Sequence, residues 1–202
     1  MEKFAESYYA IFERATYDYH LHDDVDFSVQ NPYNEGDIEY RLYLKNWIDA
    51  VQWHLEDIIR NPDIDPVEAL QLKRRIDRSN QERTDMVELI DDYFLEKYAG
   101  VKTLPDAGIN TESPAWAIDR LSILELKIFH IEKEVEREDI NEIQRDKCVL
   151  KYQVLSEQKK DLITALDALI DDISKGRKQM KVYRQMKMYN DPMLNPVLYG
   201  KK

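Results

Sequence analysis

Apolar residues recur at three- and four-residue steps along most of the chain, which is the spacing of one face of an α-helix. This pattern predicts an aromatic-rich helix over residues 4–20 and longer helices over 37–60 and 66–98. It predicts two more, one beginning at 114 and one running from about 139 toward 176. Sustained alternation and Asn-Gly turns, which mark β-hairpins, do not occur. We therefore expect an all-α fold, an antiparallel bundle of four to five long helices that occupies residues 1–176.

Local signals mark several of the helix ends. Asp65-Pro66-Val67-Glu68 combines an N-cap carboxylate, a proline at the first helical position and an acid at the third. Ser113 precedes a proline in the same way, and the run 139–142 repeats the pattern of a cap followed by an acid, with Asp139 as the expected cap. Gly100 and Gly176 supply stops for the third and fifth helices.

The helices differ in how their apolar residues are distributed. The run 118–131 leaves few directions without an apolar side chain, which predicts that the fourth helix is central. The helix over 37–60 is expected to bury Leu44, Ile48, Val51, Leu55 and Ile58. The last helix is expected to bury Ile143, Leu150, Val154, Leu162, Leu166, Leu169 and Ile173.

Composition changes after Gly176. Residues 177–202 form a basic tail rich in Met and Tyr, which could extend the fifth helix to about Tyr189. Residues 175–202 carry a charge of +7, so the net charge of −11 leaves −18 on residues 1–174. The tail either packs on this acidic body, or binds an anionic partner such as a nucleotide, a polyphosphate or a membrane surface, or docks on a partner protein. The acidic body disfavours binding of duplex nucleic acid.

The overall composition is that of a folded helical protein, with 34% charged and 43% hydrophobic residues. The lone Cys148 excludes an intramolecular disulfide and a cysteine-based zinc cluster, and we expect it in the core. No apolar run approaches the roughly 20 residues of a membrane span. The first twenty residues have no signal-peptide pattern, so we expect a cytoplasmic protein. Oligomeric state is left open.

The most informative stretch is Lys73 to Asp91, where Asn80 and Arg83 sit inside an apolar helical stripe. Buried polar groups are costly unless they are paired, so such residues either fix a register or line a site. Arg83 either forms a structural ion pair with an acid of a neighbouring helix or holds a phosphate or carboxylate ligand. Asp77 lies beside the same stripe.

Two other helices carry candidate site residues. His54 and Asp57 are one turn apart, which suits holding a metal or orienting a base; the alternative is an edge histidine beside Trp47. On the fourth helix each polar residue is expected to have a specific partner, although Asp119 and His130 lie three turns apart and cannot touch. We predict a polar ligand-binding layer between the second, third and fourth helices, formed by His54, Asp57, Asp77, Asn80, Arg83, Asp119, Arg120 and Lys127.

Known enzyme templates fit the chain poorly. Di-iron bundles need Glu-x-x-His, which does not occur, and no Gly-rich phosphate loop or nucleophile motif is present. The pairs Glu82-x-x-Asp85 and Glu88-x-x-Asp91 face different directions, leaving one mixed acidic cluster as an alternative magnesium site: Asp57, Asp77, Glu88 and Asp91. We therefore assign no catalytic residues and no metal ligands, and neither enzymatic activity nor a cofactor is specified.

Three segments together resemble a known family. They are Trp-His-Leu-Glu-Asp at 53–57, Ile-Asp-x-x-Asn-Gln-x-Arg-x-Asp at 76–85 and Ile-Asp-Arg-Leu-Ser-Ile-Leu-x-Leu-Lys-Ile at 118–128. They resemble the bacterial family called domain of unknown function 4254, over about residues 5–175. The third segment is also similar to one in small helical proteins linked with glycosyltransferases. The resemblance implies a helical, cytoplasmic protein connected with cell-envelope glycan or lipopolysaccharide synthesis, and it assigns no catalytic residues.

These observations favour a non-enzymatic binding or accessory protein that supports envelope glycan synthesis. Its expected ligand is an anionic small molecule, such as a sugar nucleotide or a phosphorylated sugar. The alternative is a metal-dependent hydrolase or transferase that acts on such a ligand.

Overall fold

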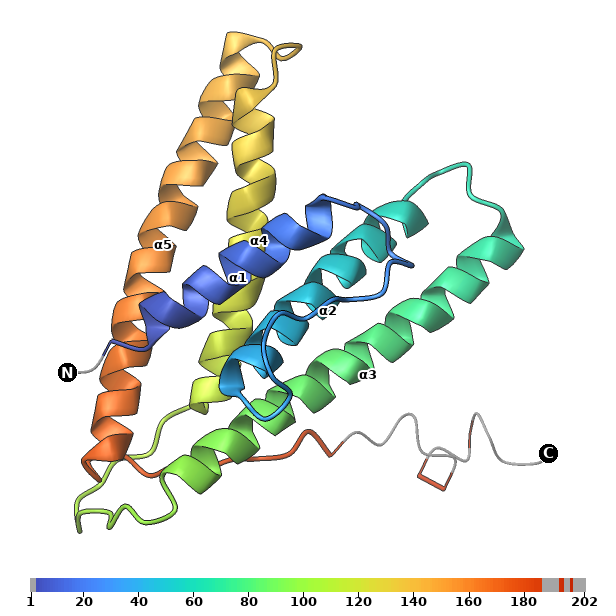
Figure 1. Cartoon of the computed structure of the whole chain (residues 1–202). Coiled ribbons are helices and arrows are strands. Elements are labelled where there is room, and N and C mark those ends of the chain that lie inside the picture. Colours follow the sequence, from blue (N-terminus) through green and yellow to red (C-terminus); the bar gives the residue numbers. More distant parts are fainter. Residues whose placement is uncertain (1–2, 187–192, 195–196, 198–202) are drawn as a thin grey trace.

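The computed structural model describes residues 3–186, 193–194 and 197. These residues form an all-α fold of five helices, as predicted (Figure 1). The helices are α1 (Ala5–His20), α2 (Ile38–Ile59), α3 (Pro66–Lys97), α4 (Pro114–Glu136) and α5 (Glu142–Ser174).

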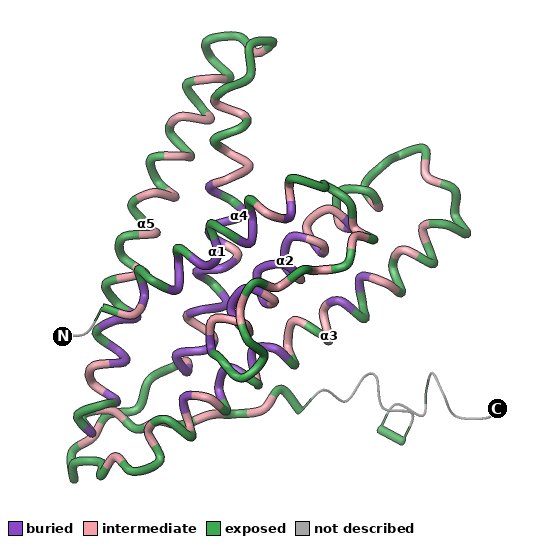
Figure 2. Tube along the Cα trace, viewed as in Figure 1, coloured by how far each residue is buried: buried purple, intermediate pink, exposed green. Residues whose placement is uncertain are grey.

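Helix α4 is the central element of the fold, which confirms the expectation from its apolar sequence. It packs against each of the other four helices. Helices α4 and α5 form a long hairpin whose tip projects beyond the rest, while α2 and α3 lie side by side and α1 crosses between the two pairs (Figure 1). Buried residues gather where α1–α4 meet the C-terminal half of α5, and the hairpin tip has none (Figure 2).

The helix caps follow local sequence in most places. The Asp65 side chain accepts hydrogen bonds from the backbone N–H groups at 67 and 68, and Ser113 caps α4. The predicted cap of α5 is wrong: Asn141, in a capping box with Gln144, begins the helix. Asp139 instead pairs with Arg137, because the chain is still non-helical at that point.

Helix α1 has no capping side chain of its own. Asp167 of α5 takes that role, since its Oδ1 accepts hydrogen bonds from the backbone N–H groups of Phe4 and Ala5, both at 2.9 Å. Asp167 is buried, so this contact ties the start of the chain to the C-terminal half of α5.

Apolar residues of α5 are buried only in its C-terminal half. Leu166, Leu169 and Ile173 are buried as predicted, and Leu162 is half-buried. The prediction is wrong for Ile143, Leu150 and Val154, which are 60–70% exposed. They lie in the projecting part of the hairpin, where only α4 covers α5 (Figure 2). Cys148 in the same stretch is half-buried rather than in the core.

The described part of the basic tail is not helical. Helix α5 ends at Ser174, and Gly176 has a φ of +70°, a backbone conformation that favours glycine. The expected helical extension is therefore wrong for residues 177–186, while its end at Tyr189 lies outside the described residues. Residues 177–179 pair with Gly108 through backbone hydrogen bonds. Arg184 then reaches Glu88 and Asp92 of α3, which is the packing on the acidic body that the charge asymmetry suggested.

Within the described ranges, no helix combines the length and apolarity that crossing a bilayer would require.

Candidate functional site

A cluster of three buried charges and one half-buried charge crosses the middle of the bundle. Lys45 and Asp49 of α2 form an ion pair, and the Lys45 Nζ also lies 2.8 Å from Asp119 of α4. Arg83 of α3 reaches the same two carboxylates, at 2.6 Å from Asp49 and 3.3 Å from Asp119. We call these residues the four-charge cluster. Two cations face two carboxylates, so the cluster is electrically balanced even though the Lys45 side chain is fully buried.

Uncharged side chains extend the four-charge cluster to α1. The Ser122 hydroxyl donates to Asp49 at 2.7 Å, and Asn46 donates to Ser122 at 3.2 Å. Thr16 of α1 donates in turn to Asn46 at 2.9 Å. The network therefore links α1, α2, α3 and α4, with the buried polar atoms paired as their desolvation demands.

The electrostatics of Arg83 agree with its ion pairs to these acids. Burial acts to lower the pKa of its guanidinium, but Asp49 and Asp119 outweigh burial and raise that pKa above its ordinary value. Of the two interpretations drawn from the sequence, the structure shows the ion pair with neighbouring helices. The shared polar layer expected from the sequence exists, but its composition differs from the prediction.

The structure brings together only some of the eight predicted residues. Arg83 and Asp119 belong to the four-charge cluster, and Asn80 lies nearby, where its side-chain Oδ1 accepts a hydrogen bond from the Gln52 side chain at 2.7 Å. The other five residues lie elsewhere. Three of them form surface ion pairs: Asp77 with Lys73, Arg120 with Glu112, and Asp57 with Arg60. Lys127 is exposed, and His54 lies with two other histidines.

Sequence reasoning missed Lys45 and Asp49. Their i,i+4 spacing is that of an ordinary surface pair on a helix. The sequence pattern predicts that the face of α2 that carries Leu44, Ile48 and Ile58 is the buried one. In the structure Leu44 and Ile48 are half-buried and Ile58 is 42% exposed. The signal available was the run of apolar residues on both sides of Lys45, which leaves little of α2 to face solvent.

A small cavity of about 240 Å³ opens beside the four-charge cluster. Its charged lining residues are Asp49, Glu56, Asp57, Arg60 and Arg83. Three carboxylates therefore face two guanidinium groups, and Arg83 is already engaged by two acids. This cavity does not offer an anion a free cation.

The alternative magnesium cluster does not form. Asp57 pairs with Arg60, Asp77 with Lys73, and Glu88 with Arg184, while burial raises the pKa of Asp91 to about 6. Among the described residues, one group of three or more His, Cys, Asp or Glu side chains converges closely enough to hold a metal ion, and it consists of His20, His54 and His130.

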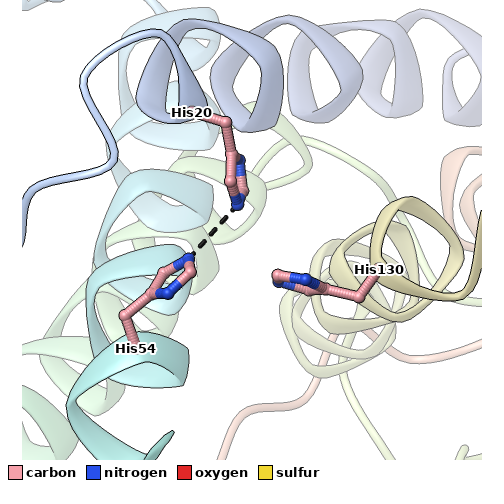
Figure 3. Close-up of side chains that lie close together, drawn as sticks. All are labelled: His20, His54 and His130. Carbon is pink, nitrogen blue, oxygen red and sulfur yellow. Dashed lines mark hydrogen bonds between the residues drawn. The ribbon is translucent and has the colours of Figure 1, made fainter. Parts of the chain in front are cut away.

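These three residues, the histidine cluster, come from the end of α1, from α2 and from α4 (Figure 3). Each offers one ring nitrogen, and the three nitrogens all lie within 4.8 Å of one another. The Nε2 atoms of His20 and His54 are 3.2 Å apart. The Nε2 of His130 is buried and has no hydrogen-bond partner.

An aromatic neighbour holds each imidazole of the histidine cluster. His130 stacks on Trp53 with ring centroids 4.6 Å apart and an angle of 8° between the planes. His54 stacks on Tyr19 at 5.3 Å, and His20 lies 4.1 Å from Phe129. Three rings that are packed in this way point to a common centre with restricted orientations (Figure 3).

Burial suppresses the protonation of two members of the histidine cluster, His20 and His130. Burial lowers the pKa of His130 to about 4, helped by the two other histidines. Burial also lowers the pKa of His20. The neutral form of imidazole is the one that ligates metals. The cluster faces a cavity of about 440 Å³, which Asp23 and Lys133 also line.

The sequence hid this arrangement because the three histidines lie 34 and 76 residues apart. Only His54 was a candidate, on the strength of Asp57 one turn away. The structure joins His54 to the other histidines instead, and places Asp23 3.6 Å from its Nε2.

A larger cavity, of about 560 Å³, lies between α2, α4 and α5. We call it the α2–α4–α5 cavity. It is lined mainly by apolar and aromatic side chains, with Lys127, Lys151 and Glu134 as its charged residues: Trp53, Lys127, His130, Ile131, Glu134, Leu150, Lys151, Val154 and Leu155. Trp53 also lines the small cavity beside the four-charge cluster, and His130 also lines the cavity at the histidine cluster.

Comparison with curated proteins finds no match, and comparison with solved structures finds none either. One family model does match, over residues 39–182, and it is described as "Protein of unknown function (DUF4254)". The match begins inside α2 and extends into the basic tail, further than the resemblance of the three sequence segments reached. His54, His130 and the four-charge cluster lie within it, and His20 precedes it. Because the match covers well over half of the chain, the protein belongs to the DUF4254 family.

Proposed function

We propose that the protein is a non-enzymatic binding protein that holds an anionic, partly apolar small molecule in the α2–α4–α5 cavity. One observation carries this proposal: an apolar cavity is bordered by two lysines, Lys127 and Lys151, that form no hydrogen bond or ion pair with any described residue. An anion held beside these ammonium groups gains charge-assisted hydrogen bonds.

The shape of the cavity supports a ligand with a flat or apolar part. Its volume of about 560 Å³ falls within the roughly 300–1,000 Å³ of small-molecule sites. Trp53 and His130, stacked nearly parallel, give it a flat aromatic wall. Leu150 and Val154 of α5, which are 62% and 60% exposed, add apolar side chains to the lining.

Charge supports an anionic ligand at this place. The chain as a whole carries −11, so unpaired lysines beside an apolar cavity are a local exception. Glu134 is also in the lining, but Arg137 pairs with it. A sugar nucleotide or a phosphorylated sugar has the required parts, because its ring can lie on the aromatic wall while its phosphate reaches the lysines.

The biological setting that we propose is support of cell-envelope glycan synthesis. The segment similar to small proteins linked with glycosyltransferases, residues 118–128, forms the middle of α4 and carries Lys127. This segment therefore contributes directly to the cavity wall.

A thermal-shift series tests the binding function. The probes are a uridine diphosphate sugar and a hexose phosphate, each with and without magnesium. A probe at about 100 times its Kd would stabilise the fold by about 2.7 kcal/mol. At about 2–4 °C per kcal/mol, the melting temperature should rise by roughly 5–10 °C.

The control variants separate the cavity from general surface charge. The pair Lys127→Ala/Lys151→Ala should abolish the rise, whereas the matched pair Lys160→Ala/Lys175→Ala, on the same hairpin but outside the cavity, should keep it. The proposal fails if neither probe stabilises the protein, or if both double variants respond like the unmodified protein.

A second function, metal-dependent hydrolysis or group transfer on the same ligand, is favoured by a specific observation. His130 lines both the α2–α4–α5 cavity and the cavity at the histidine cluster, so a metal held there would adjoin the ligand. Stabilisation by the sugar nucleotide only when metal is present, with turnover of the probe, would favour this function over the non-enzymatic one.

A further inference from the structure

We propose that His20, His54 and His130 bind one divalent transition-metal ion of the zinc class through three imidazole nitrogens, with a further coordination position open to the adjoining cavity. This goes beyond the proposed binding function, since it neither requires the anionic ligand nor uses Lys127 and Lys151.

The spacing of the nitrogens suits one metal ion. Zinc–imidazole bonds are about 2.0–2.1 Å, so two ligands of a tetrahedral site lie about 3.3 Å apart. The Nε2 atoms of His20 and His54 are 3.2 Å apart. The nitrogen of His130 completes a group whose three members all lie within 4.8 Å of one another.

Hydrogen bonding presets the tautomer of His20. Its Nδ1 lies 2.6 Å from the carbonyl oxygen of Thr16, which can only accept, so the proton of a neutral ring stays on Nδ1. The Nε2 lone pair therefore faces the cluster. A ligating histidine usually donates its other N–H in this way to a carbonyl or a carboxylate, which fixes the ring.

A hydrogen bond between His54 and His20 explains only part of the cluster. In that arrangement the Nε2–H of His54 donates to His20, and the buried Nε2 of His130 remains without a partner. A metal ion accounts for all three rings at once, since it takes a lone pair from each. On binding, His54 would carry its proton on Nδ1.

The charges around the cluster favour a cation. Asp23 lies 3.6 Å from His54 and lines the same cavity, and Asp57 acts electrostatically on His130. Lys133 also lines the cavity, but its ammonium lies over the Phe129 ring, 5.5 Å from the centroid. Three neutral nitrogens suit zinc, copper or nickel better than magnesium, which prefers oxygen ligands.

The cavity of about 440 Å³ makes the site accessible. Three protein ligands with an open fourth position are the arrangement of catalytic zinc sites, whereas structural sites are closed by four. The open position has room for a water molecule or a small anion. Asp23 lines the same cavity, and its carboxylate would accept a hydrogen bond from such a water.

The test uses the full chain after treatment with a chelator. Titration with Zn²⁺ in a calorimeter should show one tight equivalent. Co²⁺ should give the intense visible d–d bands of a four- or five-coordinate site, which Zn²⁺ then removes by displacement. His54→Gln and His130→Gln should each weaken affinity by more than about 100-fold, since even outer-shell partners of a metal are worth about 10–100-fold.

His22 provides the matched control. It is the remaining one of the four histidines of the chain, and it is exposed and stacks on Phe27 outside the cluster. His22→Gln should leave stoichiometry, affinity and the cobalt spectrum unchanged. Circular dichroism without metal establishes that each variant is folded, and if a cluster variant is not, the cobalt spectrum of the unmodified protein still decides.

Two outcomes would overturn the proposal. The first is a cobalt spectrum that remains that of the hydrated ion at one equivalent. The second is zinc binding that the cluster variants and His22→Gln share equally, because such binding would reside in the acidic surface rather than in the three histidines.

Discussion

The Lys45–Asp49 pair allows a direct measurement of how burial changes the value of an ion pair. Lys73 and Asp77 form a pair of the same chemistry and the same i,i+4 spacing on α3. The side chains of the first pair are 0% and 2% exposed, and those of the second are 54% and 57% exposed. Lys45→Met and Lys73→Met therefore remove the same charge from two surroundings that differ mainly in solvent access.

The expected cost follows from the charge balance of the cluster. Without Lys45, Asp49 and Asp119 share only Arg83, which leaves one uncompensated buried negative charge. Breaking a buried pair in this way costs about 3–5 kcal/mol, whereas an exposed i,i+4 pair is worth about 0.3–0.5 kcal/mol. Methionine retains most of the apolar stem, so the difference reports charge rather than a cavity.

Urea denaturation followed by circular dichroism at pH 7 measures both variants. The melting temperature of Lys45→Met should also fall by roughly 6–20 °C, at about 2–4 °C per kcal/mol. The reasoning is refuted if the two variants differ by less than about 1 kcal/mol.

A double variant tests whether charge balance is the cause. Lys45→Met/Asp49→Asn leaves Arg83 facing Asp119 alone, which restores neutrality. It should therefore be more stable than Lys45→Met by about 1–3 kcal/mol, the range of coupling between neighbouring residues. If the two changes are additive, the buried charge is not what destabilises the single variant.

Three further predictions concern pH and helix caps. Burial raises the pKa of Glu125 from 4.5 to about 7, so between these pH values the folded state holds a proton that the unfolded chain has lost. The free energy of unfolding should therefore fall by about 3 kcal/mol as the pH rises from about 4.5 through 7. Urea titrations from pH 4 to 8 measure this fall, and Glu125→Gln should flatten it. Asp167→Ala should cost about 2–3 kcal/mol in chemical denaturation, because two backbone N–H groups at the start of α1 lose a buried carboxylate acceptor; a cost below 0.5 kcal/mol would contradict that cap. Asn141→Ala should lower the free energy of unfolding by about 1 kcal/mol and Asp139→Ala by less than 0.5 kcal/mol. A larger cost for Asp139→Ala than for Asn141→Ala would show that Asp139 caps α5, as the sequence pattern indicated.

Local sequence was sufficient for the helices because their determinants lie within a few residues of each other. The periodicity of apolar positions placed all five helices to within a few residues, and Asp65 and Ser113 cap the helices that they precede. The same reasoning failed at α5, where Asp139 and Asn141 both suit a cap and only the path of the chain selects between them.

The polar layer shows where pattern reasoning ends. An amide and a guanidinium within an apolar stripe of α3 correctly indicated a polar layer between helices. Its other members could not be inferred, because whether a Lys–Asp pair lies on the surface or in the core depends on which face of α2 the neighbouring helices cover. Lys45–Asp49 and Lys73–Asp77 are indistinguishable by spacing alone.

The sequence by itself determined the class of this protein: an acidic all-α bundle of the DUF4254 family, with a central fourth helix and one polar interruption in the third. Only the tertiary structure decided which distant residues contact one another. It placed Asp167 at the start of α1, 162 residues away along the chain, and brought His20, His54 and His130 to one centre. Helical periodicity reports which side of a helix faces inward, but it carries no information on the rotation and height at which two helices pack. Contacts between distant residues depend on both.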